Sequence, residues 1–362
     1  MTVCPLCDSP GARDIWNLEC PAFQNKTYPT PVAARSAAMA RVDLACCPQC
    51  GFVFNRSFAP KLMDYDQEYQ NEQGHSPAFR RHLAQVLELL GRGVPSGATV
   101  VEVGCGKGLF LGLLRQAGYR VTGFDPSFEG DDPGVVREYF GPGSSVTPAD
   151  LVVLRHTLEH VPDPRGLLAT IAQANQGRGL IYVEVPCFDW IRRQRAFWDV
   201  FHEHVNYFTR RSLGALWRDC SFETLFQGQY LGCLARLEDL LPRARKSSAF
   251  CPETGFPERI ASLATYFREN PGQMLWGAGA KGASLLNLVD PGAGLVAAVI
   301  DINPRKQLRY IAHTAHPILP PESLAGFAGA TAVAMNHNYL EEIRAQAAAL
   351  RVRVVSLEDL TN

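Results

Sequence analysis

The sequence predicts an α/β protein in three parts: a small metal-binding lobe followed by two domains built on parallel sheets. Three observations predict this class. Two Cys-x-x-Cys pairs lie near the amino terminus, and a glycine-rich turn follows a β-branched run in the centre of the chain. A second such turn follows another apolar run near the carboxy terminus. Apolar runs that alternate with glycine turns and helical segments are typical of βαβ units, whose strands are parallel.

The amino-terminal cysteines form two knuckles, Cys4-Pro-Leu-Cys7 and Cys47-Pro-Gln-Cys50. Four thiolates are the ligand set of a closed tetrahedral zinc site, which leaves no open coordination position for chemistry. Such an ion supplies folding energy to a lobe that lacks a large core. Cys46 lies beside Cys47 and is an alternative ligand, although Cys47 gives the Cys-x-x-Cys spacing. Disulfides or free thiols are the alternative to a metal site. We expect a structural zinc ion held by Cys4, Cys7, Cys47 and Cys50.

Length, charge and cysteine usage limit the class of protein. A chain of 362 residues is long enough for two or three domains, each with its own core. A net charge of -1 argues against a partner bound mainly through phosphate charge, such as RNA or DNA. Eleven cysteines spread along the chain, without a signal peptide or a long apolar segment, indicate a reducing cytoplasm and no membrane anchor.

The central glycine-rich turn follows a predicted buried strand over residues 99–103. It contains three alternate glycines, Gly104, Gly106 and Gly108. Glycine allows a tight turn into a helix and lets a ligand approach the backbone closely. The next predicted strand, 120–124, ends in Asp125, and an acid in that place can accept both hydroxyls of a ribose.

The spacing of the glycines separates two kinds of nucleotide-binding turn. Dinucleotide folds use Gly-x-Gly-x-x-Gly, whereas this turn reads Gly-x-Gly-x-Gly and is preceded by Glu102. It resembles motif I of class I S-adenosylmethionine-dependent methyltransferases. A further strand, 149–154, precedes Arg-His156-Thr-Leu-Glu-His160, a loop that lies against cofactor and substrate in that superfamily. The resemblance implies a Rossmann-like domain that binds the cofactor through Glu102, the three glycines, Asp125 and His156; another nucleotide-binding α/β fold is the alternative.

A cluster of ionisable residues, Phe201-His202-Glu203-His204, follows the predicted strand 179–185. Ionisable groups among aromatic residues are poor core material because a buried charge needs a partner. If the segment is extended, His202 and His204 face one side and Glu203 the other. The spacing does not fit the His-Glu-x-x-His of zinc proteases. A neutral imidazole beside a carboxylate is suited to act as a general base, and structural hydrogen bonding is the alternative.

Together these motifs resemble the three-domain, zinc-containing sugar C-methyltransferases that methylate carbon 3 of nucleotide-linked 4-keto-deoxysugars. The resemblance includes the double Cys-x-x-Cys module, the Glu-x-Gly-x-Gly-x-Gly core and the His-Glu-His-x-x-Tyr-Phe segment. It continues into Trp-Gly-Ala-Gly-Ala-Lys281-Gly and Asp301-Ile-Asn-Pro-Arg-Lys306-Gln near the carboxy terminus. The resemblance implies a SAM-dependent C-methyltransferase of natural-product or deoxysugar biosynthesis.

The roles of that family fall on particular residues here. Its final histidine acts as the base, which implies His204, with the preceding glutamate on Glu203. Tyr69 and His160 are implied to approach the substrate, and packing or helix capping are the alternatives for them. In the implied reaction His204 removes a proton α to a ketone, and Tyr69 or His160 donates a hydrogen bond to the enolate oxygen. The carbanion then attacks the sulfonium methyl, with positioning as the main source of rate.

Departures from the family pattern bear on the acceptor. Phe201 stands where the sugar enzymes usually have tyrosine, and 229–238 lacks their Gly-Ser-Leu-Arg-like signature. The alternative is an O- or N-methyltransferase that acts on a small natural product without a nucleotide. An RNA methyltransferase is disfavoured by the charge, and an NAD-dependent reductase leaves the Gly104 turn and His204 without a role.

The carboxy-terminal segment predicts a second βαβ unit. It has strands over 273–276, 295–300 and 331–335, and a helix over 283–289. Its turn matches the dinucleotide fingerprint, but the unit is too short for a complete dinucleotide domain. The family implies instead a lobe that closes over the acceptor, where Lys281 and Lys306 meet a diphosphate and Tyr207 contacts the substrate.

These observations divide the chain into three expected domains around a linker near 240–258. We expect a zinc-binding domain over 1–65 and a methyltransferase domain over 66–240. A Rossmann-like substrate-binding domain is expected over 255–362. The expected partner is a small-molecule acceptor, with a nucleotide-linked ketosugar as the leading candidate and no nucleic acid or membrane.

Overall fold

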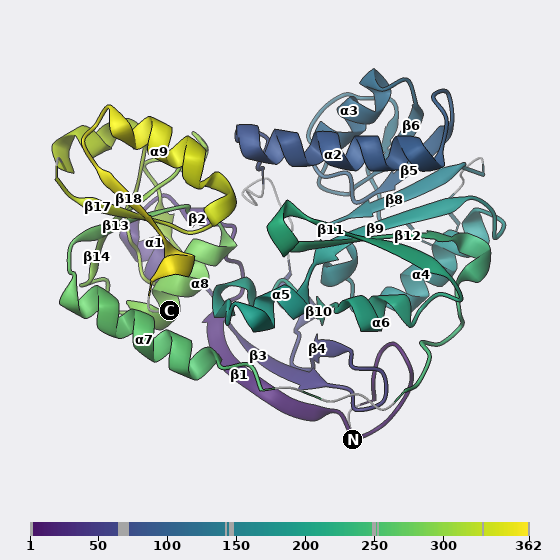
Figure 1. Ribbon diagram of the computed structural model, residues 1–362, viewed down its shortest axis with the longest axis horizontal. Helices are drawn as coiled ribbons and strands as arrows, with labels where there is room; N and C mark the ends of the chain where they lie inside the picture. The colour runs from purple at the N-terminus through teal and green to yellow at the C-terminus, as the bar shows by residue number, and fades with distance from the viewer. Residues whose placement is uncertain are drawn as a thin grey trace.

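The computed structural model describes residues 3–63, 72–141, 143–144, 148–247, 251, 253–327 and 329–360. Figure 1 shows a small sheet at the bottom, a large sheet with its helices on the right and a third α/β unit on the left. The two larger sheets are wholly or largely parallel. This arrangement confirms the predicted α/β class.

The amino-terminal lobe is joined to both other parts of the molecule through backbone hydrogen bonds. Its own elements are β1 (Arg13–Pro21), β2 (Thr27–Tyr28), α1 (Pro31–Arg35), β3 (Met39–Cys46) and β4 (Val53–Asn55). In the sheet β1-β3-β4-β10, the last strand is β10 (Asn206–Tyr207), which comes from the centre of the chain. The strand β2 pairs with β15 (Tyr310–Ile311) of the carboxy-terminal domain.

The central sheet has seven strands in the order β11-β12-β9-β8-β5-β6-β7. These are β5 (Thr99–Val103), β6 (Arg120–Phe124), β7 (Val135–Val136), β8 (Leu151–Arg155), β9 (Leu180–Pro186), β11 (Cys220–Leu225) and β12 (Tyr230–Arg236). β12 runs antiparallel to both of its neighbours, and the other pairs are parallel. The order reverses at β5, and ligands of such sheets bind beyond the carboxyl ends of the strands at the reversal.

In the described part of the chain, the helices that accompany this sheet are α2 (Pro77–Gly93), α3 (Leu109–Gln116), α4 (Pro164–Ala174), α5 (Phe188–Arg193) and α6 (Arg210–Gly214). The start of α2 is set locally, because the Ser76 hydroxyl accepts the Phe79 backbone N–H at 3.2 Å and Pro77 has no N–H to satisfy. Its buried residues recur every three or four positions, as Phe79, Leu83, Val86 and Leu90. One face of α2 is therefore buried in the core.

The carboxy-terminal domain is a five-stranded parallel sheet in the order β16-β14-β13-β17-β18. Its elements are α7 (Phe256–Glu269), β13 (Gln273–Trp276), α8 (Ala280–Val289), β14 (Val296–Ile300), β16 (Ile318–Leu319), β17 (Thr331–Ala334), α9 (Leu340–Ala348) and β18 (Arg353–Ser356). The helix α8 begins three residues earlier than the sequence predicts, because the turn before it is shorter.

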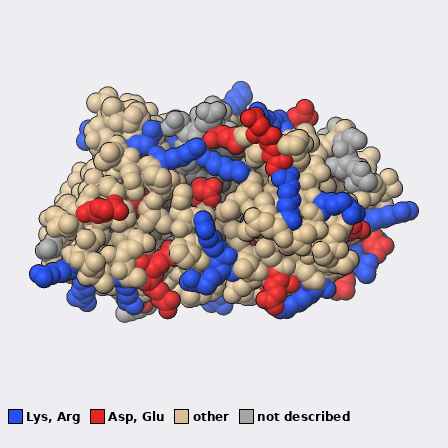
Figure 2. Space-filling view, turned by 90° about the horizontal axis from the view of Figure 1, so that it is seen from above, with Lys and Arg blue, Asp and Glu red and all other residues tan. Residues whose placement is uncertain are grey.

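A disulfide joins Cys46 at the end of β3 to Cys251, 205 residues further along the chain. The sequence offers Cys46 only as an alternative metal ligand, since the fold alone brings Cys251 beside it. On the face seen in Figure 2, basic and acidic side chains are interspersed, so neither sign dominates it. Among the described residues, no helix is long and apolar enough to cross a membrane.

Candidate active site

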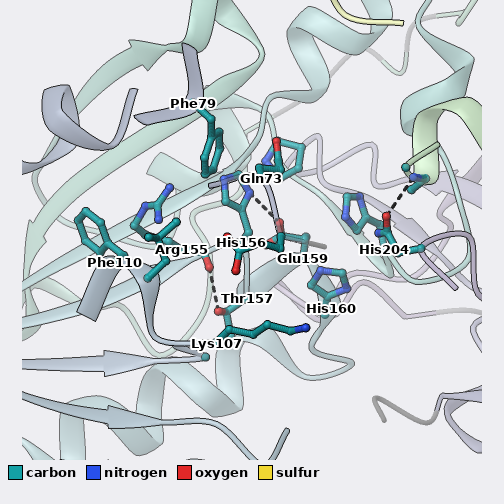
Figure 3. Close-up of a pocket in the computed structure, with 18 of the residues that line it drawn as sticks. Gln73, Phe79, Lys107, Phe110, Arg155, His156, Thr157, Glu159, His160 and His204 are labelled. Carbon is teal, nitrogen blue, oxygen red and sulfur yellow. Dashed lines mark hydrogen bonds and ion pairs between the residues drawn. The ribbon is translucent and has the colours of Figure 1, made fainter. Parts of the chain in front are cut away.

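A cavity of about 790 Å³ lies between the central and carboxy-terminal domains. One wall contains the ends of β5, β6 and β8 with the loops that follow them, and the other contains the loops after β13 and β14. Figure 3 shows its central-domain side. The predicted site residues that line it are Glu102, Gly104, Gly106, Asp125, His156, His160, His204, Lys281 and Lys306. Both domains therefore contribute to one site.

The glycine turn after β5 requires glycine at its first position. Gly104 has a φ of +77°, and a Cβ there would lie 2.2 Å from the Thr157 Oγ1. Gly108 has a φ of +78° and starts α3, but it does not line the cavity. The Gly106 N–H donates to the Asp125 Oδ2 at 2.8 Å. The turn is thus folded onto the carboxylate that ends the next strand.

Two carboxyl groups border this part of the cavity. Asp125 also accepts the Ser127 N–H and hydroxyl at 2.8 and 2.7 Å, which fixes its orientation. Glu102 is 2% exposed, and burial raises its pKa to about 8. The Glu102 Oε2 has no hydrogen-bond partner in the described part of the chain. The glycine turn lets a ligand approach the backbone closely, and the Glu102 Oε2 is a buried oxygen that a ligand could bind. Both features fit a bound polar cofactor at this turn.

His156 is held by two glutamates. Its Nδ1 lies 3.3 Å from the Glu159 Oε1, and its Nε2 lies 3.0 Å from the Glu184 Oε1. Burial alone would lower the pKa of His156, but the hydrogen bonds to Glu159 and Glu184 raise it. Glu184 is also contacted by His82 at 3.0 Å and by Arg155 at 2.9 Å. His156 is therefore part of a buried charge network that lines the cavity.

His160 and His204 lie together at one end of the cavity, with their ring centroids 4.8 Å apart (Figure 3). The His160 Nδ1 is 2.8 Å from the Glu203 carbonyl oxygen, so it donates there and its lone pair is on Nε2. Burial lowers the pKa of both imidazoles, and that of His204 lies well below its usual value. Both rings are neutral at neutral pH and suited to accept a proton.

Glu203 points away from the cavity. Its carboxylate accepts the backbone N–H groups of Gln24 and Asn25 at 3.1 and 3.3 Å, and burial raises its pKa to about 7. The His202 Nε2 accepts the Ala59 N–H at 3.1 Å, so this ring also faces the amino-terminal lobe. Residues 202–203 form a turn. His202 and His204 therefore contact different parts of the molecule. An extended segment would have placed both histidines on one side.

Tyr207 lies behind the loop over residues 201–204. It is 1% exposed, and its hydroxyl donates to the Phe201 carbonyl at 3.0 Å and accepts the Phe201 N–H at 3.2 Å. Phe201 lines the cavity, with its ring centroid 4.1 Å from that of His204. Tyr207 therefore supports the loop, while Phe201 is the side chain beside His204 in the cavity.

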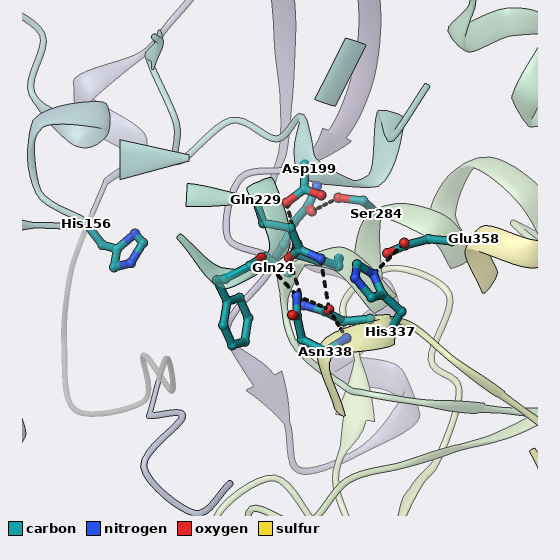
Figure 4. Close-up of polar contacts among 12 residues, drawn as sticks. Gln24, His156, Asp199, Gln229, Ser284, His337, Asn338 and Glu358 are labelled. Carbon is teal, nitrogen blue, oxygen red and sulfur yellow. Dashed lines mark hydrogen bonds and ion pairs between the residues drawn. The ribbon is translucent and has the colours of Figure 1, made fainter. Parts of the chain in front are cut away.

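Lys281 connects the two domains. Its Nζ lies 2.9 Å from the Asp199 Oδ1 and donates to the Gln229 Oε1 at 3.0 Å. Gln229, which is labelled in Figure 4, exchanges two amide hydrogen bonds of 2.9 Å with Asn336. The Asp199 Oδ2 has no hydrogen-bond partner among the described residues, and Asp199 lines the cavity. The Lys281 charge is therefore already paired.

Lys306 and Asn303 lie in the carboxy-terminal wall. Lys306 is 5% exposed and donates to the Ala278 carbonyl at 3.3 Å; burial lowers its pKa. Asn303 is 3% exposed and lines the cavity, and its Nδ2 has no partner in the described chain. The side chain of Asn25 caps the Ala280 N–H of α8 at 3.0 Å. The Lys306 ammonium and the Asn303 amide are donors that suit an anionic or polar part of a ligand.

The four predicted metal-binding cysteines come together away from the cavity. Cys4 and Cys50 have sulfur atoms 3.6 Å apart, as do Cys7 and Cys47. All four are at most 1% exposed. Zinc–sulfur bonds of about 2.3 Å in a tetrahedron place sulfurs about 3.8 Å apart. The cluster has the dimensions of a tetrathiolate site.

Sequence reasoning missed several cavity residues. Tyr69 lies outside the described residues. Asp199 had no local motif to mark it, because its partner Lys281 is distant in the sequence. Asn303 lies within the segment 301–307 that the sequence singles out, but only Lys306 was selected from it. Glu159 had a signal, since it stands between His156 and His160 in one short loop.

Two family models match the chain. Residues 74–226 match a methyltransferase domain, and residues 260–356 match a C-methyltransferase C-terminal domain. The expected methyltransferase domain is therefore present, and it is followed by a domain found in C-methyltransferases.

Curated relatives match parts of the chain. C-methyltransferase NovU of Streptomyces niveus is 28% identical over 191 residues, which covers 48% of this chain and 45% of that protein. Ubiquinone biosynthesis O-methyltransferase of Xylella fastidiosa is 30% identical over 112 residues, which covers 27% and 46% respectively. The chain thus spans less than half the length of either relative. Among solved structures, the Burkholderia thailandensis 1,6-didemethyltoxoflavin-N1-methyltransferase gives a TM-score of 0.33 at 18% identity, over 45% of this chain and 79% of that one.

Proposed function

We propose that this protein is a SAM-dependent C-methyltransferase that acts on an enolisable carbon of a small molecule. The observation that carries the proposal is one cavity in which the glycine turn after β5 and the His160–His204 pair face a C-methyltransferase C-terminal domain. Glu102, Gly104, Gly106, Asp125 and His156 would hold the cofactor, which supplies an electrophilic methyl group when bound.

In the proposed reaction His204 removes the proton from the carbon beside the acceptor carbonyl. Its neutral state and its place at the end of the cavity support this role. Tyr69 would stabilise charge on the acceptor oxygen. His160 lies next to His204 and donates its Nδ1–H to the Glu203 carbonyl, so its Nε2 would stabilise that oxygen only after it has itself taken up a proton. Glu203 contributes by fixing the loop against the amino-terminal lobe rather than by touching the acceptor.

We infer a nucleotide-linked ketosugar of natural-product or deoxysugar metabolism as the leading acceptor. Lys306 and Asn303 are buried donors in the carboxy-terminal wall of the cavity that His204 also lines, so one elongated ligand would meet all three. Lys281 would orient this part through its partner Asp199. Tyr207 would act only through Phe201, whose backbone it holds.

An O- or N-methyltransferase on a small natural product is the second candidate. Phe201 gives the reacting end an apolar wall, and one partial relative is an O-methyltransferase. The same neutral imidazoles would deprotonate a hydroxyl or amine.

We further propose a structural zinc ion at Cys4, Cys7, Cys47 and Cys50, supported by the sulfur separations and their burial. The domain division we propose is 1–65 for the zinc-binding domain, 66–240 for the methyltransferase domain and 255–362 for the substrate-binding domain.

Hydrogen exchange tests the proposed chemistry. The protein, saturated with S-adenosylhomocysteine, is incubated in D₂O with a nucleotide-linked 4-keto-deoxysugar. Deuterium uptake at the carbon beside the ketone supports C-methylation, and His204→Asn should abolish it while S-adenosylhomocysteine still binds. Uptake that persists in His204→Asn would exclude His204 as the base.

A melting experiment tests the nucleotide handle. Thymidine diphosphate at a hundred times its dissociation constant should add about 2.7 kcal/mol of stability to the S-adenosylhomocysteine complex. No shift at millimolar nucleotide would direct the search to acceptors without a nucleotide.

A further inference from the structure

Three side chains, of which Glu159 and His204 are buried and His160 is partly buried, converge at the His204 end of the cavity. Glu159, His160 and His204 each present a ligand atom, and these atoms all lie within 4.8 Å of one another. Glu159 is 1% exposed and His204 is 8% exposed. Within the described chain, the Glu159 Oε2 and the His204 Nδ1 have no hydrogen-bond partner. A buried polar atom without a partner is unfavourable, so such a group in a native protein indicates a water, an ion or a ligand.

The chemistry of these groups selects a cation. A carboxylate oxygen and the lone pairs of two neutral imidazoles are all acceptors. His160 donates its Nδ1–H to the Glu203 carbonyl at 2.8 Å, an arrangement that commonly orients metal-ligating histidines. Glu159 is oriented in the same way by His156, at 3.3 Å. Two imidazoles and one carboxylate suit a divalent transition ion better than Mg²⁺ or Ca²⁺, which prefer oxygen ligands.

We propose that Glu159, His160 and His204 form a second metal site, which takes a divalent transition ion such as Zn²⁺ or Co²⁺ through one oxygen and two nitrogens. Bonds from zinc to such atoms are about 2.0–2.2 Å long, so the ligands close by roughly an ångström on binding.

Two neighbouring basic groups oppose the ion. His156 shares Glu159, and Lys281 acts on the His204 imidazole through space, although Lys281 is paired with Asp199 at 2.9 Å. The site therefore binds more weakly than the four-cysteine cluster, where four thiolates surround the ion.

The metal ion and the proton that His204 would remove both bind to a lone pair of the His204 imidazole. An imidazole nitrogen that is bound to a metal cannot accept a proton, so the occupied site blocks deprotonation by His204. This consequence rests on the proposed function, whereas ion binding itself does not. Failure of the metal site would leave methyl transfer untouched, and failure of methyl transfer would leave the metal titration valid.

A Co²⁺ titration of the full-length protein, with zinc already in the four-cysteine cluster, tests the site. We expect one further ion per chain, with visible ligand-field bands but no thiolate charge-transfer band, because only nitrogen and oxygen bind it. Glu159→Gln and His204→Gln should each weaken Co²⁺ binding at least about 100-fold, since even changes to the partners of metal ligands cost 10- to 100-fold. His75→Gln, which changes an exposed imidazole of the same cavity, is the matched control and should bind as the wild type does.

Two results would overturn the site. One is a wild-type protein that takes no ion beyond the cysteine cluster. The other is a folded Glu159→Gln or His204→Gln protein that binds Co²⁺ as tightly as the control. Binding of S-adenosylhomocysteine establishes that each variant is folded, and the wild-type stoichiometry decides the matter if neither variant folds.

Discussion

Replacement of Gly104 by alanine tests the turn that holds the proposed cofactor. The residue has a φ of +77°, and its new Cβ would lie 2.2 Å from the Thr157 Oγ1. The Thr157 hydroxyl is placed between the carbonyls of Val103 and Arg155, at 3.1 and 3.2 Å. The added methyl group must therefore either displace this hydroxyl or move the turn.

Two contributions set the loss of stability: the strain of a left-handed backbone at alanine and the loss of the Thr157 hydrogen bond. Left-handed backbone costs an L-residue about 1–2 kcal/mol. Loss of the Thr157 hydrogen bond adds roughly 0.5–1.5 kcal/mol, and more if its acceptors stay buried and unpaired. We expect Gly104→Ala to lower the free energy of unfolding by about 2–4 kcal/mol. Movement of the turn should also weaken S-adenosylhomocysteine binding at least about tenfold, or 1.4 kcal/mol.

Urea unfolding and calorimetric binding measure these two quantities. Gly112→Ala is the matched control, because its Cβ meets no atom within 4 Å in α3 and alanine favours helix by roughly 0.5–1 kcal/mol. The double variant Gly104→Ala/Thr157→Ala removes the two closest contacts of the new methyl group, those with the Thr157 Oγ1 and Cγ2, and should recover part of the stability. A Gly104→Ala protein with wild-type stability and affinity would refute the reasoning.

Three further predictions concern the cluster, the buried charges and the domain contact. Cys47→Ser should lose both bound zinc and soluble yield, and a soluble, zinc-free, fully active variant would contradict the structural role. Burial alone would raise the pKa of Glu184, but Arg155 and the neighbouring histidines hold it well below its usual value. Its contribution to stability is therefore present above the unfolded value near pH 4.3 and is lost as the pH falls below it. Glu184→Gln should destabilise the protein at pH 7 and flatten urea-unfolding stability between pH 5 and 3; an unchanged acid slope would argue against this. Lys281→Met leaves Asp199 buried without its cation and should cost about 3 kcal/mol or more in thermal unfolding, whereas Lys281→Arg should lose less. Equal melting of the two variants would show that the ion pair adds nothing.

Sequence reasoning succeeded where the signal is local. The strands that border the glycine turn have the predicted bounds, 99–103 and 120–124, because β-branched runs flanked by glycine leave little choice of register. The clustering of the four amino-terminal cysteines was also predictable, since each pair carries its own spacing.

The local sequence cannot show the contacts on which a role depends when the partner is distant. Lys281 looks like an anion ligand in isolation, but the fold pairs it with Asp199 and Gln229. Glu203 looks catalytic beside His204, but a turn directs its carboxylate to the amino-terminal lobe. In both cases the sequence shows a charged side chain. Where that side chain points depends on contacts with residues far away in the sequence.

The contacts of Asn25 have a consequence for protein engineering. Its backbone N–H binds Glu203, one residue from the proposed base, while its side chain caps α8 of the carboxy-terminal domain. Exchange of carboxy-terminal domains between relatives is an obvious way to seek new acceptors. Such a chimaera would also have to carry a matching Gln24–Asn25 segment, because this short stretch aligns the incoming domain with His204.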